Sequence, residues 1–213
     1  MHASSTRIRF GAWLVLLLFC LAVSAYAVAY LVLGGEMYPP NLAASFFTHS
    51  TSLKLHVAGG GLALAIGPFL LGGPRARRGR HRALGKLYVG AVLLGGLGGL
   101  SLARFSYGGW PTHLGFAALG LAWIGATCAA LLRIRRGEVE AHRAWMTRSF
   151  ALTLAAVSLR IQLPLAGALG IPFEASYPVV SWSCWIPNLL VAEVLVRRAA
   201  GRRSLPVHVA SAA

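Results

Sequence analysis

The sequence predicts an all-α integral membrane protein with six transmembrane helices, of which the second to fifth form a tandem-repeat four-helix bundle. Hydrophobic residues make up 57% of the 213 residues and charged residues only 12%, which is not the composition of a soluble protein. The apolar residues gather into six runs, each close to the roughly 20 residues that span about 30 Å of hydrocarbon. We therefore predict a single membrane domain over residues 1–213.

The runs cover approximately residues 12–34, 53–72, 87–105, 113–132, 149–169 and 179–196. The first run resembles a signal peptide, because Ala25-Tyr26-Ala27 imitates a cleavage site. A signal peptide has an apolar core of about 7 to 15 residues, and this run is longer. We expect a retained helix, followed by an outer loop that completes residues 1–52.

Basic residues are distributed unevenly between the two sides of the predicted membrane. Seventeen of the 20 fall on one side if every run spans: Arg7, Arg9, Arg75, Arg77, Arg78, Arg80, Arg82, Lys86, Arg133, Arg135, Arg136, Arg143, Arg148, Arg197, Arg198, Arg202 and Arg203. The positive-inside rule predicts a bacterial inner-membrane protein with both termini, including the tail 198–213, in the cytoplasm. The charge of +15 is thus explained by topology and by the lipid bilayer, and we exclude nucleic acid as a partner.

Two segments of the chain share one pattern, which predicts an internal duplication. Residues 53–106 form the first copy and residues 113–170 the second, before the sixth helix at 179–197. His81 and His142 each open a His-Arg-Ala triplet before an apolar run that ends near an arginine, and His56 and His113 each open the preceding run. Duplication is one interpretation, and chance similarity between Ala- and Gly-rich membrane segments is the other.

Arginines near or inside the spans are the next candidates. Arg160 lies about 16 Å above Ser149 by helix rise, where a charge costs at least about 2.5 kcal/mol, so we expect a polar or anionic partner inside the bundle. Arg104 lies near the outer boundary, where a long side chain reaches the headgroups. Glu193 should lie closer to the cytoplasm than Arg160, so we expect it to pair with an inner-face basic residue.

The histidines predict two metal-binding pairs. Helices two and four both descend from the outside, so His56 and His113 share an outer depth; helices three and five ascend, so His81 and His142 share an inner depth. A b-type haem needs two neutral imidazoles across an apolar cavity, with arginines such as Arg160 and Arg104 to neutralise its propionates. Histidines beside phospholipid headgroups are the simpler alternative. Cys20, Cys128 and Cys184 fall in apolar runs and form neither a haem-attachment motif nor a zinc motif.

Two resemblances bear on this reading. The segments HRAWMTRSFALTLAAVSLRIQLP and WSCWIPNLLVAE resemble a family of uncharacterised bacterial integral membrane proteins over roughly residues 50–195. The histidine layout is also similar to that of the ascorbate-reducible transmembrane di-haem cytochromes b. This second resemblance implies one haem on His56 and His113 and another on His81 and His142. The chain departs from that family at Gly85, where a further histidine is usual.

Two functions follow as hypotheses. The first is transmembrane electron transfer through two b-type haems, from a cytoplasmic donor to a periplasmic acceptor, each a small molecule or a protein. The second is a haem-free transporter or assembly factor in which Arg160 contacts an anionic substrate. An absorption spectrum distinguishes the two.

Overall fold

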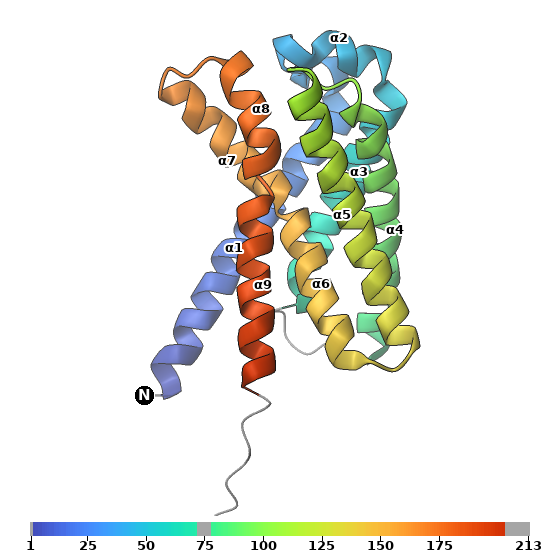
Figure 1. Ribbon diagram of the computed structural model, residues 1–213, viewed down its shortest axis with the longest axis vertical. Coiled ribbons are helices and arrows are strands. Elements are labelled where there is room, and N and C mark those ends of the chain that lie inside the picture. Colours follow the sequence, from blue (N-terminus) through green and yellow to red (C-terminus); the bar gives the residue numbers. More distant parts are fainter. Residues whose placement is uncertain (1, 72–77, 203–213) are drawn as a thin grey trace, which may run out of the picture.

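The computed structural model describes residues 2–71 and 78–202, and within them every regular element is a helix (Figure 1). The helices are α1 (His2–Leu33), the 3-10 helix η1 (Gly34–Met37), α2 (Pro40–Thr48), α3 (Ser50–Leu71), α4 (Arg78–Ala103), α5 (Trp110–Arg135), α6 (Val139–Thr153), α7 (Ala155–Ala168), α8 (Phe173–Ser183) and α9 (Ile186–Gly201). Six segments are long and apolar enough to cross a membrane: Phe10–Met37, Ser50–Leu71, Gly79–Ala103, Trp110–Arg135, Val139–Ala168 and Phe173–Gly201. The prediction of six membrane-spanning segments is confirmed.

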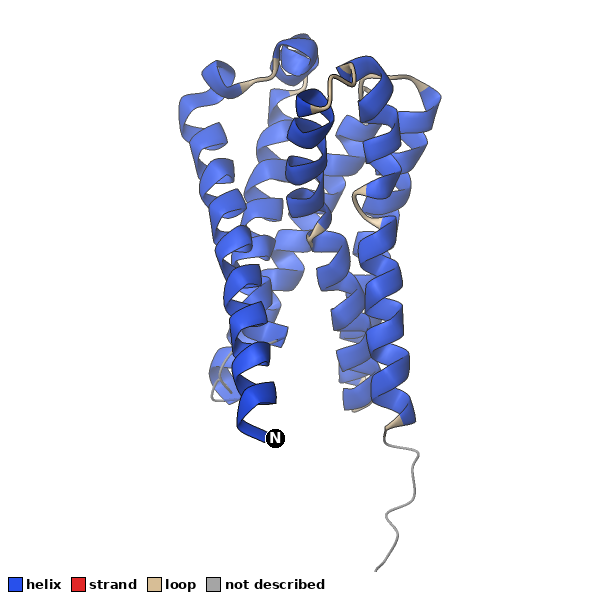
Figure 2. Ribbon diagram, turned by 90° about the vertical axis from the view of Figure 1, so that its left-hand side faces the viewer, coloured by secondary structure: helices blue, strands red, loops and turns tan. Residues whose placement is uncertain are grey.

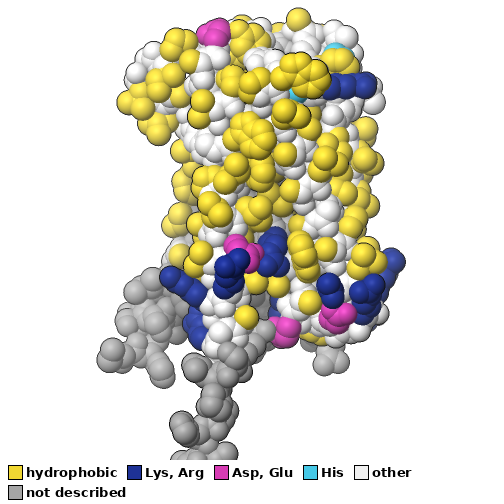
Figure 3. Space-filling model, in the orientation of Figure 1, with side chains coloured by type: hydrophobic (Ala, Val, Ile, Leu, Met, Phe, Trp, Pro, Cys, Tyr) yellow, Lys and Arg dark blue, Asp and Glu magenta, His cyan; other side chains and the backbone are white. Residues whose placement is uncertain are grey.

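The two ends of the molecule differ in charge. The first turn of α1, the turn between α5 and α6, and the last turn of α9 lie at one end, and α2 lies at the other (Figures 1 and 2). Basic side chains gather at the first of these ends, beyond a broad apolar surface (Figure 3). We call them the basic end and the α2 end. Arg75, Arg77 and residues 203–213 of the predicted tail lie outside the described residues, whereas the start of that tail belongs to α9.

Helices α3, α4, α5 and α6 pack as a closed ring, in which each helix contacts the next and α6 contacts α3. Helix α3 therefore lies opposite α5, and α4 lies opposite α6. Glycine allows the closest contact, between α3 and α4: a Cβ atom on Gly95 would lie 2.8 Å from the backbone nitrogen of Gly60. Small residues have this role in membrane helix packing. The internal duplication stays a prediction.

Two of the spans are broken, although each lies within a single apolar run of the sequence. Helix α6 ends at Thr153, whose hydroxyl donates to the carbonyl of Ser149 at 3.0 Å, a bond that bends helices. Helices α8 and α9 separate just before Pro187, which has no N–H to donate to the carbonyl of Ser183. Gln162 supplies the missing donor through its Nε2 at 3.1 Å, and so ties α7 to the break.

A buried hydrogen-bond network connects α4, α5 and α6 inside the ring. The Tyr88 hydroxyl lies 3.0 Å from Ser149 Oγ and 2.9 Å from Thr153 Oγ1. Trp123 donates its indole N–H to Thr153 Oγ1 at 2.9 Å, and Thr127 Oγ1 lies 2.7 Å from Ser149 Oγ. Each side-chain polar atom in this network has a partner, as burial in an apolar interior requires.

Candidate functional site

A cavity of about 510 Å³ lies at the α2 end of the helical ring, where α1, α7 and α8 complete its walls. Its walls come from all the spanning segments, with α2 near one end, and they are mostly apolar and aromatic. Backbone at five glycines forms part of the wall: Gly60, Gly95, Gly96, Gly99 and Gly120. Several polar side chains also line the cavity, among them Tyr26, Tyr30, His56 and Arg160. An apolar chamber with a few convergent polar groups is the usual form of a small-molecule site.

His56 is the imidazole on this cavity wall. Its Nδ1 lies 2.8 Å from the carbonyl oxygen of Gly95 on α4, so Nδ1 carries the proton and the lone pair of the neutral ring lies on Nε2. No described residue forms a hydrogen bond with Nε2. A Cβ atom on Gly99 would lie 2.7 Å from Nδ1, so glycine is needed there to make room for the ring. Metal-binding histidines are commonly oriented by such a backbone acceptor.

Arg160 comes from α7, beyond the break in the fifth span. Its Nη1 donates to the Ala156 carbonyl at 3.1 Å, and its guanidinium carbon lies 5.2 Å from the centre of the Tyr26 ring. Its Nε is buried without a hydrogen-bond partner. The expected partner inside the bundle is thus, among the described residues, a carbonyl and an aromatic ring. One edge of the guanidinium is left open.

His113 lies at the rim of the cavity rather than on its wall. Its Nε2 is 2.8 Å from the carbonyl oxygen of Ser106, and its ring packs edge-on against Trp110 at 5.9 Å between centroids. Ser106 itself lines the cavity. The structure therefore places His113 at the same end as His56 but does not bring the two imidazoles together.

The second predicted pair lies toward the basic end. Helices α4 and α6 begin at Arg78 and Val139, so both histidines lie within helices, as the haem interpretation requires. His142 Nδ1 is 2.9 Å from the Ala130 carbonyl oxygen, which leaves its Nε2 free of that bond. His81 is exposed. Within the described residues, no group of three or more His, Cys, Asp or Glu side chains could hold a bare metal ion.

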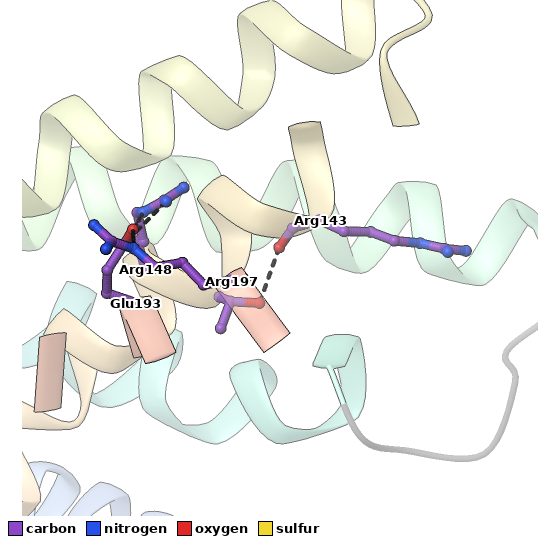
Figure 4. Close-up of polar contacts among 5 residues, drawn as sticks. Arg143, Arg148, Glu193 and Arg197 are labelled. Carbon is purple, nitrogen blue, oxygen red and sulfur yellow. Dashed lines mark hydrogen bonds and ion pairs between the residues drawn. The ribbon is translucent and has the colours of Figure 1, made fainter. Parts of the chain in front are cut away.

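The remaining candidates do not face the cavity. Arg104 is exposed and its guanidinium carbon lies 4.6 Å from the centre of the Phe105 ring, so the structure gives it the peripheral position expected of a residue that reaches the headgroups. Glu193 accepts hydrogen bonds from Arg148 at 2.7 Å and from Arg197 at 2.9 Å. Figure 4 shows both arginines converging on this carboxylate. The prediction that Glu193 pairs with basic residues is confirmed, whereas its placement on the inner face of the membrane stays a prediction.

Sequence reasoning missed part of this site. Tyr26 and Tyr30 were read as residues of the first apolar run, yet they reach the cavity beside Arg160. Their spacing of four residues places them on one face of α1, which was the available signal. The break near Leu154 was also missed, and Thr153 and Ala155 beside it line the cavity, as does Cys184 beside the second break.

Comparison with known proteins places the chain in a family. A model of the predicted membrane proteins DUF2306 matches residues 53–196. The chain belongs to this family. The match includes the four histidines of the predicted pairs and Arg160, whereas Tyr26 and Tyr30 lie outside it on α1. Searches of the curated proteins and of the solved structures give no match.

Proposed function

We propose that this member of the family binds b-type haem inside its helical ring and transfers electrons across a bacterial inner membrane, with the basic end in the cytoplasm. The observation that carries the proposal is the bonding of His56 on the wall of an apolar cavity. Its Nδ1 is fixed by the Gly95 carbonyl, and its Nε2 has no hydrogen-bond partner among the described residues. This is the arrangement that an axial imidazole needs. Bound haem would supply a one-electron ferric–ferrous couple.

The ring order supports pairing of histidines across the bundle. His56 on α3 lies opposite α5, which carries His113 at its first turn, seven residues before Gly120 on the cavity wall. Seven residues are about two helical turns, so both lie on one face of α5. To act as the second ligand, His113 must exchange its bond to the Ser106 carbonyl for the iron. His56 is thus positioned to bind the haem iron as it stands, and His113 could bind it after a rotation of its side chain.

The pair at the basic end is supported by register. His81 and His142 lie seven residues before Tyr88 and Ser149 respectively, and those two side chains touch across the ring. Two helical turns below that contact, the histidines occupy the same faces of α4 and α6. Along α4, His81 lies about 21 Å of helix rise from Gly95, whose carbonyl bonds His56. Two centres at these levels would cover most of the bilayer thickness.

The chain's own residues would create the environment for such a couple. The apolar walls exclude water, and the glycines allow a flat ligand to approach the backbone. Tyr88, Trp123 and the hydroxyls bonded to them close the ring between the two histidine levels without unsatisfied polar groups. The electron donor and acceptor are small molecules or proteins on the two faces of the membrane.

The test compares two histidines at the α2 end. His56→Ala should lower the ratio of haem to protein by about half, because one of two centres loses an axial ligand. His49→Ala is the matched control, since His49 stacks on Phe105 at 3.7 Å between centroids and bonds the Ser45 carbonyl. Equal haem content in both variants, as purified after expression with ample haem, contradicts the assignment of His56.

A haem-free transporter is the second candidate, and the broken helices favour it. Discontinuous helices near the middle of the membrane commonly form substrate sites in transporters, and here both breaks border the cavity. Purified protein with no Soret absorption supports this candidate over electron transfer.

A further inference from the structure

We infer that Arg160 is a carboxylate receptor in the apolar interior, which binds the acid group of the molecule that fills the cavity. The inference deepens the proposed function, because a haem propionate is one source of such a group. The carboxylate of a bilayer amphiphile is the other. The receptor rests on the contacts of Arg160 and stands whether or not haem is the ligand.

The guanidinium presents one open edge. Nη1 already donates to the carbonyl of Ala156 in its own helix, while Nε is buried without an acceptor and Nη2 has no hydrogen-bond partner among the described residues. The Nε–H and Nη2–H bonds point in parallel from one side of the planar group. This edge matches the two oxygens of a carboxylate in a bidentate pair.

No described residue supplies a negative charge to Arg160. Among the acidic residues of the six described spans, only Glu193 lies away from a span end. Its Oε2 accepts from Arg148 and its Oε1 accepts from Arg197, so its charge is already paired. Arg160 lies eight residues from Ala168, about 12 Å from the helix end. A cation at such depth normally has a partner, so an anion from outside the chain completes the site.

The surroundings select a carboxylate. The Arg160 guanidinium lies over Tyr26, and the Tyr26 and Tyr30 rings lie 5.4 Å apart; within the described residues neither hydroxyl has a hydrogen-bond partner. These phenols can donate to oxygens that already accept from the guanidinium edge. A phosphate group would leave further oxygens without donors against apolar walls, which is costly. Arg160 also lines a smaller hollow beneath α1, with Val23 and Ala27.

The experiment uses two pairs of probes that differ in the acid group. The first pair is haem and its dimethyl ester, and the second is dibromostearate and the corresponding dibromo-alcohol. Binding to the full chain in detergent is followed by quenching of tryptophan fluorescence, and Trp123→Phe shows how much of the signal comes from the cavity wall. The wild-type protein should bind at least one acid about tenfold or more tightly than its neutral analogue, the strength of a charge-assisted hydrogen bond.

Arg160→Gln should remove this preference, and Arg104→Gln, at an exposed arginine, should retain it. Preference within the haem pair assigns the carboxylate to a propionate, and preference within the fatty-acid pair assigns it to an amphiphile. Equal binding of acid and neutral analogue in both pairs by the wild-type protein overturns the inference, even if Arg160→Gln does not fold. Failure to bind haem together with a preference for the fatty acid contradicts the proposed electron transfer but supports the receptor.

Discussion

The position of the His56 ring depends on a single missing methyl group. Gly95 and Gly99 form a small-x-x-x-small pair, a spacing that normally indicates contact between helices. Gly95 does contact α3, whereas Gly99 leaves room for an imidazole. A glycine that makes room for a side chain has the same spacing in the sequence as a glycine that makes room for a neighbouring helix. The sequence pattern therefore cannot distinguish the two roles.

Substitution at Gly99 tests this role. Gly99→Ala should destabilise the protein by about 1–3 kcal/mol, the usual effect of overpacking, and should lower haem content by moving His56 off the Gly95 carbonyl. Gly90→Ala is the control, because a Cβ atom there meets nothing within 4 Å. Unfolding in mixed micelles and the haem-to-protein ratio are the measurements. A stable, haem-replete Gly99→Ala protein contradicts the account of this contact.

The contacts of Glu193 and His113 differ in how far the sequence could predict them. A basic partner for Glu193 could be predicted because helix rise alone fixes the depth of this residue, whereas the choice of Arg148 and Arg197 depends on how the helices pack. The Nε2 bond of His113 could not be predicted, since it depends on the carbonyl direction of Ser106 before a turn with positive φ at Gly108 and Gly109.

At the scale of the elements, hydrophobic runs predicted the six spans but not their continuity. An apolar run shows where a helix crosses the membrane, whereas a break arises from local bonds such as Thr153 to the Ser149 carbonyl. Pro187 by itself indicates a break in the helix, whereas the partner of the freed carbonyl, Gln162, could be found only from the packing of α7 against α8. The hydroxyl network was missed because Ser, Thr and Tyr in apolar runs give no periodic signal.

The network should carry measurable stability. Tyr88→Phe removes the hydroxyl that links α4 to Ser149 and Thr153 and should lower the free energy of unfolding by about 1–3 kcal/mol. Tyr107→Phe is the control, because Tyr107 is 38% exposed. If detergent unfolding curves shift equally for the two variants, the network does not hold the ring together.

At the scale of the molecule, the charge asymmetry predicts orientation. Alkaline phosphatase fused after Pro40 should be active, because the α2 end faces the periplasm under the positive-inside rule. A fluorescent protein inserted at Gly137, in the turn between α5 and α6 at the basic end, should be bright, because that turn lies in the cytoplasm. The reverse pattern would exchange the compartments that the two histidine levels face.

The central claim is that the helical ring holds haem, and the haem-to-protein ratio of the purified wild-type chain tests it most directly. After expression with ample haem, a pyridine haemochrome assay should give about two b-type haems per chain, because the ring presents two histidine levels. Reduction should sharpen the visible bands of both centres. Protein that is folded and monodisperse but shows no Soret absorption contradicts the claim.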